Sequence, residues 1–412
     1  MPDVGFTNLL IVTLIALVAP LSLGFVPRLR MPAVVLEIVA GVVVGPSVLG
    51  WVHADLAVSI VAVLGLAFLL FLAGLEIDLD RLRGGALRLA LAGYVVTLAL
   101  GLAVGGALGA VGWVRSPVLL AVALSATSLG LVVPVLKDAR KLDGGLGQSV
   151  VAAASVADFA AIVLLSLFFS TSESGTGTRV ALLLLFAALV ALTGAVALAV
   201  SHSMSLSAVV TRLQDSTAEI RVRAAVLLLV GFVALAAKLG LETILGAFLA
   251  GAVVGLVDKD TSTHPHFRTK LEALGYGFLI PVFFVASGLR LDLAGLLDHP
   301  SALARVPVLA LALLVVRGVP ALLLARQHDR RSVVAAGLLQ ATSLPFLVTA
   351  SQIGVATGTM SATTAAALVC AGLLSVIAYP AIALGLLRGA DEAAATPPLS
   401  SDARPAPHPQ RS

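Results

Sequence analysis

Long apolar blocks separated by short polar segments recur along the whole chain. We count thirteen blocks of roughly 17 to 25 residues, each long enough to cross the ~30 Å hydrocarbon core of a bilayer as a helix. The predicted spans are 6–26, 32–50, 56–76, 86–110, 117–136, 147–169, 179–201, 222–239, 241–257, 273–289, 306–325, 333–353 and 362–387. The pattern predicts an all-α polytopic membrane protein with about 13 transmembrane helices.

Composition and charge support this fold class and indicate an orientation. Of the 412 residues, 59% are hydrophobic and 12% are charged, about half the charged share that is usual in soluble domains. Lys and Arg concentrate in alternate loops, which predicts a multi-pass protein of the cell (plasma or inner) membrane with the N-terminus outside and the C-terminus in the cytoplasm. Because these basic residues are spread over many loops, they indicate topology and not a nucleic-acid interface.

Three short motifs occur twice, in the same order and at a nearly constant spacing along the chain. The repeated pairs are Ala40–Gly45 with Ala250–Gly255, Gly74–Leu79 with Gly288–Leu293, and Ala126–Leu129 with Ala341–Leu344. The paired motifs lie seven predicted helices apart, and because seven is odd, the two halves cross the membrane in opposite directions. This is an inverted-topology repeat, which is typical of secondary transporters.

The repeat divides the chain. We assign repeat 1 to about 6–169, a linking helix to 179–201 and repeat 2 to about 222–387, all within a transmembrane domain that covers 1–388. The remaining residues, 389–412, are rich in Ala, Pro and Ser, and we expect them to form a disordered cytoplasmic tail.

Asp158 is the only ionisable residue in the apolar stretch 147–169, which places a carboxylate near the middle of the bilayer. A charge at that depth costs at least ~2.5 to 3.5 kcal/mol, so it marks a candidate site for ion or proton transport. Arg317, deep in the block 306–325, is the natural counter-charge. Ser155 lies on the same helix face as Asp158 and could supply a second oxygen to a monovalent cation. A static Asp158–Arg317 pair that only holds helices together is the open alternative.

The two Ala-Thr-Ser-Leu motifs interrupt apolar blocks with hydroxyl groups and a nearby proline. In transporters with inverted repeats, such interruptions expose backbone groups to a cavity near the midplane. We therefore predict two broken helices that contribute to the ion site, with the candidate residues Thr127, Ser128 and Pro134 in the first and Thr342, Ser343 and Pro345 in the second.

Other carboxylates are weaker candidates. Glu37 lies in the second block near a glycine-rich segment, where it could line the cytoplasmic mouth of the site. Glu76 lies at a predicted helix end, close to Arg81, and we expect it to be solvated.

Several stretches resemble the monovalent cation:proton antiporters of the sodium/hydrogen exchanger superfamily, in their Kef-type and NapA-like branch. The similar stretches are Leu36–Pro46, Phe71–Leu79, Ser125–Leu129, Leu245–Gly251 and Pro281–Leu289. The resemblance implies an NhaA/NapA-like fold with crossed discontinuous helices, a homodimer, and a core domain that moves like an elevator. It also implies that Asp158 carries the ion and that Arg317 occupies the place of the family's lysine or arginine.

One position departs from the family pattern. Family members commonly show two adjacent polar residues, whereas Ala157 precedes Asp158 in this chain. In the family, two aspartates paired with a lysine are associated with electrogenic exchange. A single carboxylate beside an arginine, which keeps its proton, favours electroneutral exchange of one cation for one proton.

The sequence thus predicts a secondary transporter that exchanges Na⁺ or K⁺ for H⁺ and needs no cofactor beyond the transported ions. Its expected partners are membrane lipid and a second copy, and a separate regulatory subunit is a further candidate. The alternatives are a sodium-coupled organic-anion symporter of related fold and a channel-like K⁺ efflux protein. The chain shows no phosphate-binding glycine loop, no metal-ligand cluster and no nucleophile beside a deep histidine, so we do not expect an enzyme.

Overall fold

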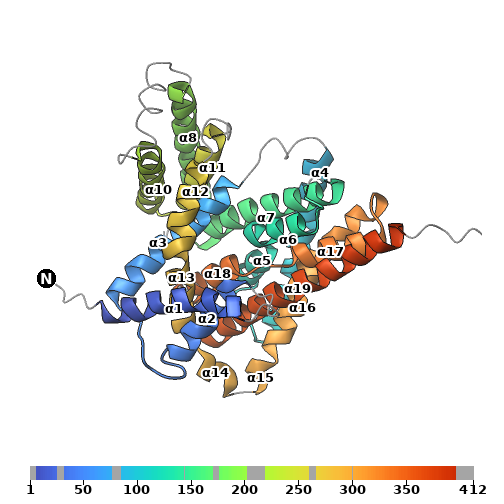
Figure 1. Cartoon of the computed structure of the whole chain (residues 1–412), viewed down its shortest axis with the longest axis horizontal. Coiled ribbons are helices and arrows are strands. Elements are labelled where there is room, and N and C mark those ends of the chain that lie inside the picture. The colour runs from blue at the N-terminus through green and yellow to red at the C-terminus, as the bar shows by residue number, and fades with distance from the viewer. Residues whose placement is uncertain are drawn as a thin grey trace, which may run out of the picture.

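The computed structural model describes residues 6–25, 32–76, 85–142, 144–169, 176–201, 219–258, 266–298 and 300–395, and these residues contain helices and no strands. The predicted all-α membrane fold is confirmed (Figure 1). Over the described residues, 11 helical segments are long and apolar enough to cross a membrane. Two further apolar helices have 12 and 15 residues, about 18 and 23 Å at 1.5 Å per residue. Our count of thirteen full-length spans is therefore not confirmed.

The helices follow the predicted blocks in order. Their bounds are α1 Thr7–Phe25, α2 Ala33–Val44, α3 Leu56–Leu75, α4 Gly85–Ala110, α5 Pro117–Ser125, α6 Leu129–Asp138, α7 Gly145–Phe169, α8 Thr176–Ser201, α10 Ile220–Lys238, α11 Thr243–Val257, α12 Phe267–Leu274, the π-helix η1 Gly275–Leu279, α13 Ile280–Leu289, α14 Leu293–Leu297, α15 Pro300–Leu303, α16 Arg305–Gly318, the 3₁₀-helix η2 Val319–Arg326, α17 Arg330–Gln340, α18 Pro345–Ala356 and α19 Ala362–Ala395.

Both predicted interruptions are present. The block 117–136 consists of α5 and α6, and the block 333–353 lies within α17 and α18, with the Ala-Thr-Ser-Leu motif at each break. Freed backbone groups at such breaks need partners inside the protein, because a bilayer offers none. The two motifs therefore mark a place where polar backbone is buried among helices.

Two groups of helices make up the described chain. Helices α1, α2, α3, α8, α10, α11, α12 and α13, with η1, pack mainly on one another, and we call them the panel. Helices α4, α5, α6, α7, α16, α17, α18 and α19, with η2, pack into a second group, which we call the bundle. Figure 1 shows the panel towards the left of the molecule and the bundle towards the right.

Close glycine contacts in the panel follow the sequence repeat. A side-chain carbon on Gly41 of α2 would collide with the carbonyl oxygen of Val285 in α13. A side-chain carbon on Gly251 of α11 would collide with the carbonyl oxygen of Phe71 in α3. The two contacts are equivalent, because the repeat pairs Gly41 with Gly251 and Phe71 with Val285. Each short helix thus packs closely on a longer helical segment from the other half of the chain: α11 packs on α3, and α2 packs on α13, the last part of the segment Phe267–Leu289.

The end of the chain differs in part from our expectation. We predicted disorder from residue 389, but α19 continues to Ala395. Residues 396–412 lie outside the described part of the chain. The helix is extended by a run of alanines, which have the highest helix propensity of all residues.

Candidate functional site

The two helix breaks lie side by side in the bundle and are hydrogen-bonded to each other. The backbone N–H of Ser128 donates to the carbonyl oxygen of Thr342 at 2.9 Å. The hydroxyl of Thr127 donates to the carbonyl oxygen of Gln340 at 2.7 Å. These bonds join segments from the two halves of the chain and satisfy part of the backbone that the breaks free.

Asp158 on α7 binds the first break through backbone N–H groups. Its Oδ1 accepts a hydrogen bond from the N–H of Thr127 at 3.0 Å, and its Oδ2 accepts a longer one from the N–H of Leu129 at 3.4 Å. Leu129 is the first residue of α6, so the carboxylate lies at a helix N-terminus, where free N–H groups and the helix dipole favour negative charge. The closest partners of the Asp158 carboxylate are therefore backbone N–H groups of the broken helix, and not the arginine that the sequence suggested.

Arg317 contacts Thr127 and does not pair directly with Asp158. Its side chain is 1% exposed. Its Nε and Nη2 donate to the hydroxyl oxygen of Thr127 at 2.8 and 2.6 Å, and its Nη1 donates to the hydroxyl oxygen of Thr97 at 3.2 Å. The direct Asp158–Arg317 pair that we expected is absent from the ion pairs of the described residues. Thr127 lies between the two charges, with its N–H on Asp158 and its hydroxyl on Arg317.

Thr97 on α4 is a contact that the sequence did not reveal. It is a fully buried hydroxyl in a helix whose other polar side chains are Arg88 and Tyr94. A lone threonine in a membrane helix usually bonds its own backbone, so its position in the sequence carries no signal for an arginine partner.

Asp158 is reached from a cavity of about 60 Å³ between the panel and the bundle. One water needs at least about 10 to 15 Å³, so this volume accommodates more than one water, or a cation with part of its hydration shell. The polar side chains that line it are Asp158, Thr127, Ser128, Glu76 and Tyr276. Apolar residues including Phe248 and Phe346 line the remainder. The cavity therefore offers oxygen ligands in an otherwise apolar surround.

Glu76 corrects our expectation of a solvated helix end. It caps the C-terminus of α3, lines the same cavity as Asp158, and has a buried Oε2 without a hydrogen-bond partner. A side-chain carbon at Gly130 would lie 3.9 Å from both Glu76 oxygens, so this carboxylate faces the first turn of α6. An unpartnered buried oxygen is costly unless a ligand or water satisfies it. The sequence signal that pointed here was the repeated Gly-Leu-x motif at positions 74–76 and 288–290.

The remaining serine and threonine candidates lie near the breaks but outside this cavity. Ser155 is buried on α7, and Ser343 has a buried hydroxyl without a hydrogen-bond partner. The hydroxyl of Thr342 donates to the carbonyl oxygen of Leu338 in the last turn of α17 at 3.1 Å. None of these three side chains lines the cavity with Asp158.

The two prolines and Glu37 have different positions. Pro345 is at the start of α18, where the missing N–H costs nothing, whereas Pro134 lies inside α6, after the break.

Glu37 is 4% exposed on α2 and does not line the Asp158 cavity. The mouth role that we expected for Glu37 therefore has no support at this cavity.

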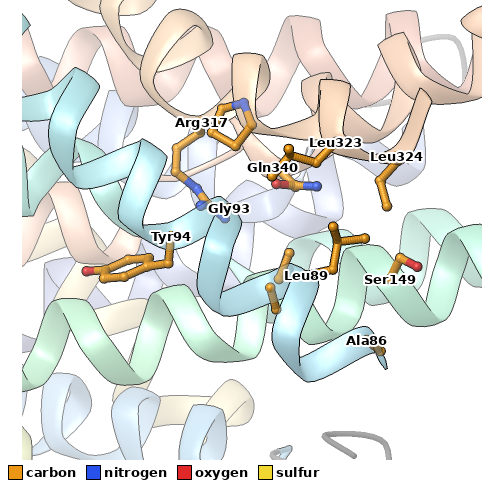
Figure 2. Close-up of a pocket in the computed structure, with 12 residues that line it drawn as sticks. Ala86, Leu89, Gly93, Tyr94, Ser149, Arg317, Leu323, Leu324 and Gln340 are labelled. Carbon is orange, nitrogen blue, oxygen red and sulfur yellow. The ribbon is translucent and has the colours of Figure 1, made fainter. Parts of the chain in front are cut away.

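A second, smaller cavity of about 20 Å³ lies behind Arg317. Figure 2 shows Arg317 and Gln340 at this cavity, with Tyr94 and Gly93 of α4 beside them. The volume suffices for about one water. The buried guanidinium therefore has Thr127 on one side and, on the other, a small space that is lined mostly by apolar residues, with Tyr94, Ser149 and Gln340 as its other polar side chains.

Comparisons with known proteins agree with the fold and with the membrane character of the chain. The family model described as sodium/hydrogen exchanger, transmembrane, matches residues 13–384. The Bacillus subtilis (strain 168) protein YjbQ, for which Na⁺/H⁺ antiport is an assumed activity, is 32% identical over 395 residues, which cover 92% of this chain and 63% of YjbQ. An Enterococcus hirae protein named Na⁺/H⁺ antiporter is 32% identical over 275 residues, 64% of this chain and 68% of that protein.

A solved structure gives the same fold. The sodium proton antiporter MjNhaP1 from Methanocaldococcus jannaschii superposes with a TM-score of 0.63 at 18% identity, over 93% of this chain and 99% of that one. The chain spans less than two thirds of the length of YjbQ. The family model, in contrast, covers most of the chain, and the chain therefore belongs to the transmembrane sodium/hydrogen exchanger family.

Proposed function

We propose that the protein is a secondary active transporter that exchanges a monovalent cation, Na⁺ or K⁺, for H⁺, with Asp158 as the site that both ions share. The observation that carries the proposal is the half-buried Asp158 carboxylate, held by N–H groups at a helix break and open to a small polar cavity. The names of two relatives specify Na⁺, so Na⁺ is the first cation to test.

Competition for one carboxylate couples the two ions. When Asp158 is ionised it binds the cation, with the hydroxyl of Ser128 and the Glu76 carboxylate as further oxygens near the same cavity. The Thr127 hydroxyl, which we expected to bind the cation, is instead fully used by its hydrogen bonds with Arg317 and Gln340. When Asp158 takes up a proton it loses its charge and releases the cation. Since the two bound forms exclude each other, the carboxylate carries either one proton or one cation per crossing.

Alternating access follows from a shift of the bundle against the panel. Asp158 lines the 60 Å³ cavity and not the larger one of about 460 Å³ between α13, α18 and α19. A hydrogen bond of 3.1 Å from Gln352 of α18 to Ser287 of α13 joins bundle and panel beside that larger cavity. An elevator-like movement that breaks this contact and opens a path from Asp158 to the larger cavity would complete the cycle. The distribution of Lys and Arg supports a cytoplasmic position for the smaller cavity.

Exchange by this site is expected to be electroneutral, because one carboxylate carries one proton or one monovalent cation. The test is reconstitution of the native chain into liposomes with a pH dye inside, followed by addition of Na⁺ or K⁺ across a proton gradient. We expect cation-dependent changes of internal pH whose rate is unaltered by a potassium and valinomycin voltage clamp. Clamp-dependent exchange would reject electroneutrality, and no cation-dependent proton movement would reject the antiporter proposal.

Thr127→Val tests how the arginine is connected to the site. The variant keeps the backbone N–H on Asp158 but removes the hydroxyl that accepts from Arg317 and donates to Gln340. Leaving these buried groups unpaired costs about 1 to 3 kcal/mol. We expect a lower melting temperature in detergent and a roughly tenfold slower exchange in liposomes, because RT ln 10 is about 1.4 kcal/mol. Thr127→Ser keeps the hydroxyl and is the control, so it should retain most of the native melting temperature and exchange rate. An equal loss in the two variants would show that the loss of the hydroxyl does not cause the change.

We further propose that the protein acts as a homodimer in the cell membrane, with the panel as the candidate interface. Helices α1, α8 and α10 expose large apolar side chains, among them Leu17, Leu184 and Leu227. Lipid would cover the same side chains in a monomer. The mass of the protein in lipid nanodiscs distinguishes the two states, and co-purification tests for a separate regulatory subunit.

A further inference from the structure

The two repeats place opposite charges at the same structural position. Glu76 is the C-cap of α3 and Arg290 is the C-cap of α13, and each follows a Gly-Leu pair that belongs to the same repeated motif. The glycines of these pairs, Gly74 and Gly288, also make equivalent contacts. A side-chain carbon at either would collide with a carbonyl oxygen of the partner short helix, in α11 or α2 respectively.

The two caps lie at opposite ends of an antiparallel helix pair. In the middle of α3, Gly65 faces the carbonyl of Leu279 and the side chain of Phe283. Further along α3, Leu72 faces Gly275, which comes earlier in the partner segment. Residue numbers therefore rise along one helix as they fall along the other. The C-terminal caps of α3 and α13 consequently face opposite sides of the membrane.

Each cap lines a different cavity. Glu76 lines the 60 Å³ cavity with Asp158, and Arg290 lines the 460 Å³ cavity with Ser287, Gln352 and Asp292. The Asp292 carboxylate caps α14 by accepting from the N–H of Gly295 at 2.9 Å. Arg290 is exposed, and its Nη2 donates to the hydroxyl oxygen of Ser59 at 3.0 Å, so its positive charge meets a neutral partner there.

We propose that Arg290 and Glu76 give the transporter a different cation affinity on each side of the membrane. Arg290 lowers the affinity for a cation that enters through the 460 Å³ cavity, and Glu76 raises the affinity for a cation that enters through the 60 Å³ cavity. The inference rests on the proposed cation:proton exchange. Charges on the wall of a cleft with low-dielectric surroundings act strongly on an entering ion, because the field is focused and only partly screened. The asymmetry changes the half-saturation concentration on each side and leaves the equilibrium, which the ion gradients fix, unaltered.

The test measures the KM for Na⁺ from each side in sealed membrane vesicles of the two orientations, with a pH dye reporting exchange. For Arg290→Gln we expect the KM on the Arg290 side to fall by about three- to tenfold, the effect of one unit charge at roughly 10 Å in a partly aqueous cavity. The KM on the other side should not change. Arg290→Lys keeps the charge and should keep the native KM, and Ser59→Ala removes the hydrogen-bond partner without changing charge and should do the same.

The reciprocal variant is Glu76→Gln, for which we expect a raised KM on the Glu76 side alone. Asp298→Asn removes an exposed carboxylate that lines neither cavity, and it serves as the matched control. Exchange with unchanged KM values in Arg290→Gln, or an equal fall of the maximal rate in both orientations without a change in KM, would overturn this inference while leaving the antiporter proposal in place. Absence of any Na⁺-dependent proton movement in the native vesicles would overturn both.

Discussion

Asp158→Asn is expected to abolish cation-dependent proton movement in liposomes while the protein remains folded. An asparagine can neither take up a proton nor carry the negative charge that binds a cation, so we expect exchange to fall by roughly a hundredfold or more, to the background of empty liposomes. The amide oxygen of asparagine can still accept from the N–H of Thr127, which donates to Asp158 Oδ1 in the native protein. The measurement is the initial rate of internal pH change after Na⁺ addition, together with the melting temperature in detergent.

The matched control for this substitution is Asp298→Asn. Asp298 is exposed and lies next to α14, outside the three cavities described above, so the same chemical change there should leave exchange intact. Retained exchange in Asp158→Asn would contradict the proposed site and would direct attention to Glu76 as the group that carries the proton.

The breaks and the deep carboxylate could be predicted because their signals are local in the sequence. Asp158 is isolated in an apolar block, and each Ala-Thr-Ser-Leu motif places hydroxyls in another. Their hydrogen-bond partners were harder to assign. Charge suggested that Arg317 would contact Asp158, yet Thr127 lies between them because the breaks from the two repeats pack side by side. Such an arrangement depends on helix placement, which hydropathy does not encode.

Glu76 was misjudged for a related reason. A carboxylate at the end of an apolar block is usually solvated, and only the packing of the bundle over the end of α3 brings it to the cavity of Asp158. The inverted repeat was more informative than hydropathy, because the repeated motif pairs Glu76 with Arg290 from the sequence alone.

Helix length was overestimated where apolar residues continue past a helix end. The second predicted block ran to residue 50, but α2 ends at Val44. Pro46 disfavours a helical conformation at Gly45, which is extended with ψ near 179°. The repeat-related helix α11 is likewise short, with 15 residues. The two deviations from full-length spans thus occur at equivalent positions in the two halves.

The close approach of these short helices leads to a prediction about stability. Gly251→Ala is expected to destabilise the protein, because the added carbon would collide with the carbonyl oxygen of Phe71 in α3. The backbone of α3 has little freedom to retreat, since Gly74 one turn later packs equally closely on the carbonyl oxygen of Phe248 in α11. Overpacking of this kind costs about 1 to 3 kcal/mol. The readout is the melting temperature in detergent.

Gly231→Ala on α10 is the matched control, because no atom lies within 4 Å of the added carbon. There the change should be neutral or stabilising by up to ~1 kcal/mol, as alanine favours the helix more than glycine does. Gly41→Ala occupies the repeat-equivalent position and should reproduce the loss seen for Gly251→Ala. If only one of these two variants were destabilised, the two halves would not share this contact, and the argument that places Glu76 and Arg290 at equivalent positions would lose its structural basis.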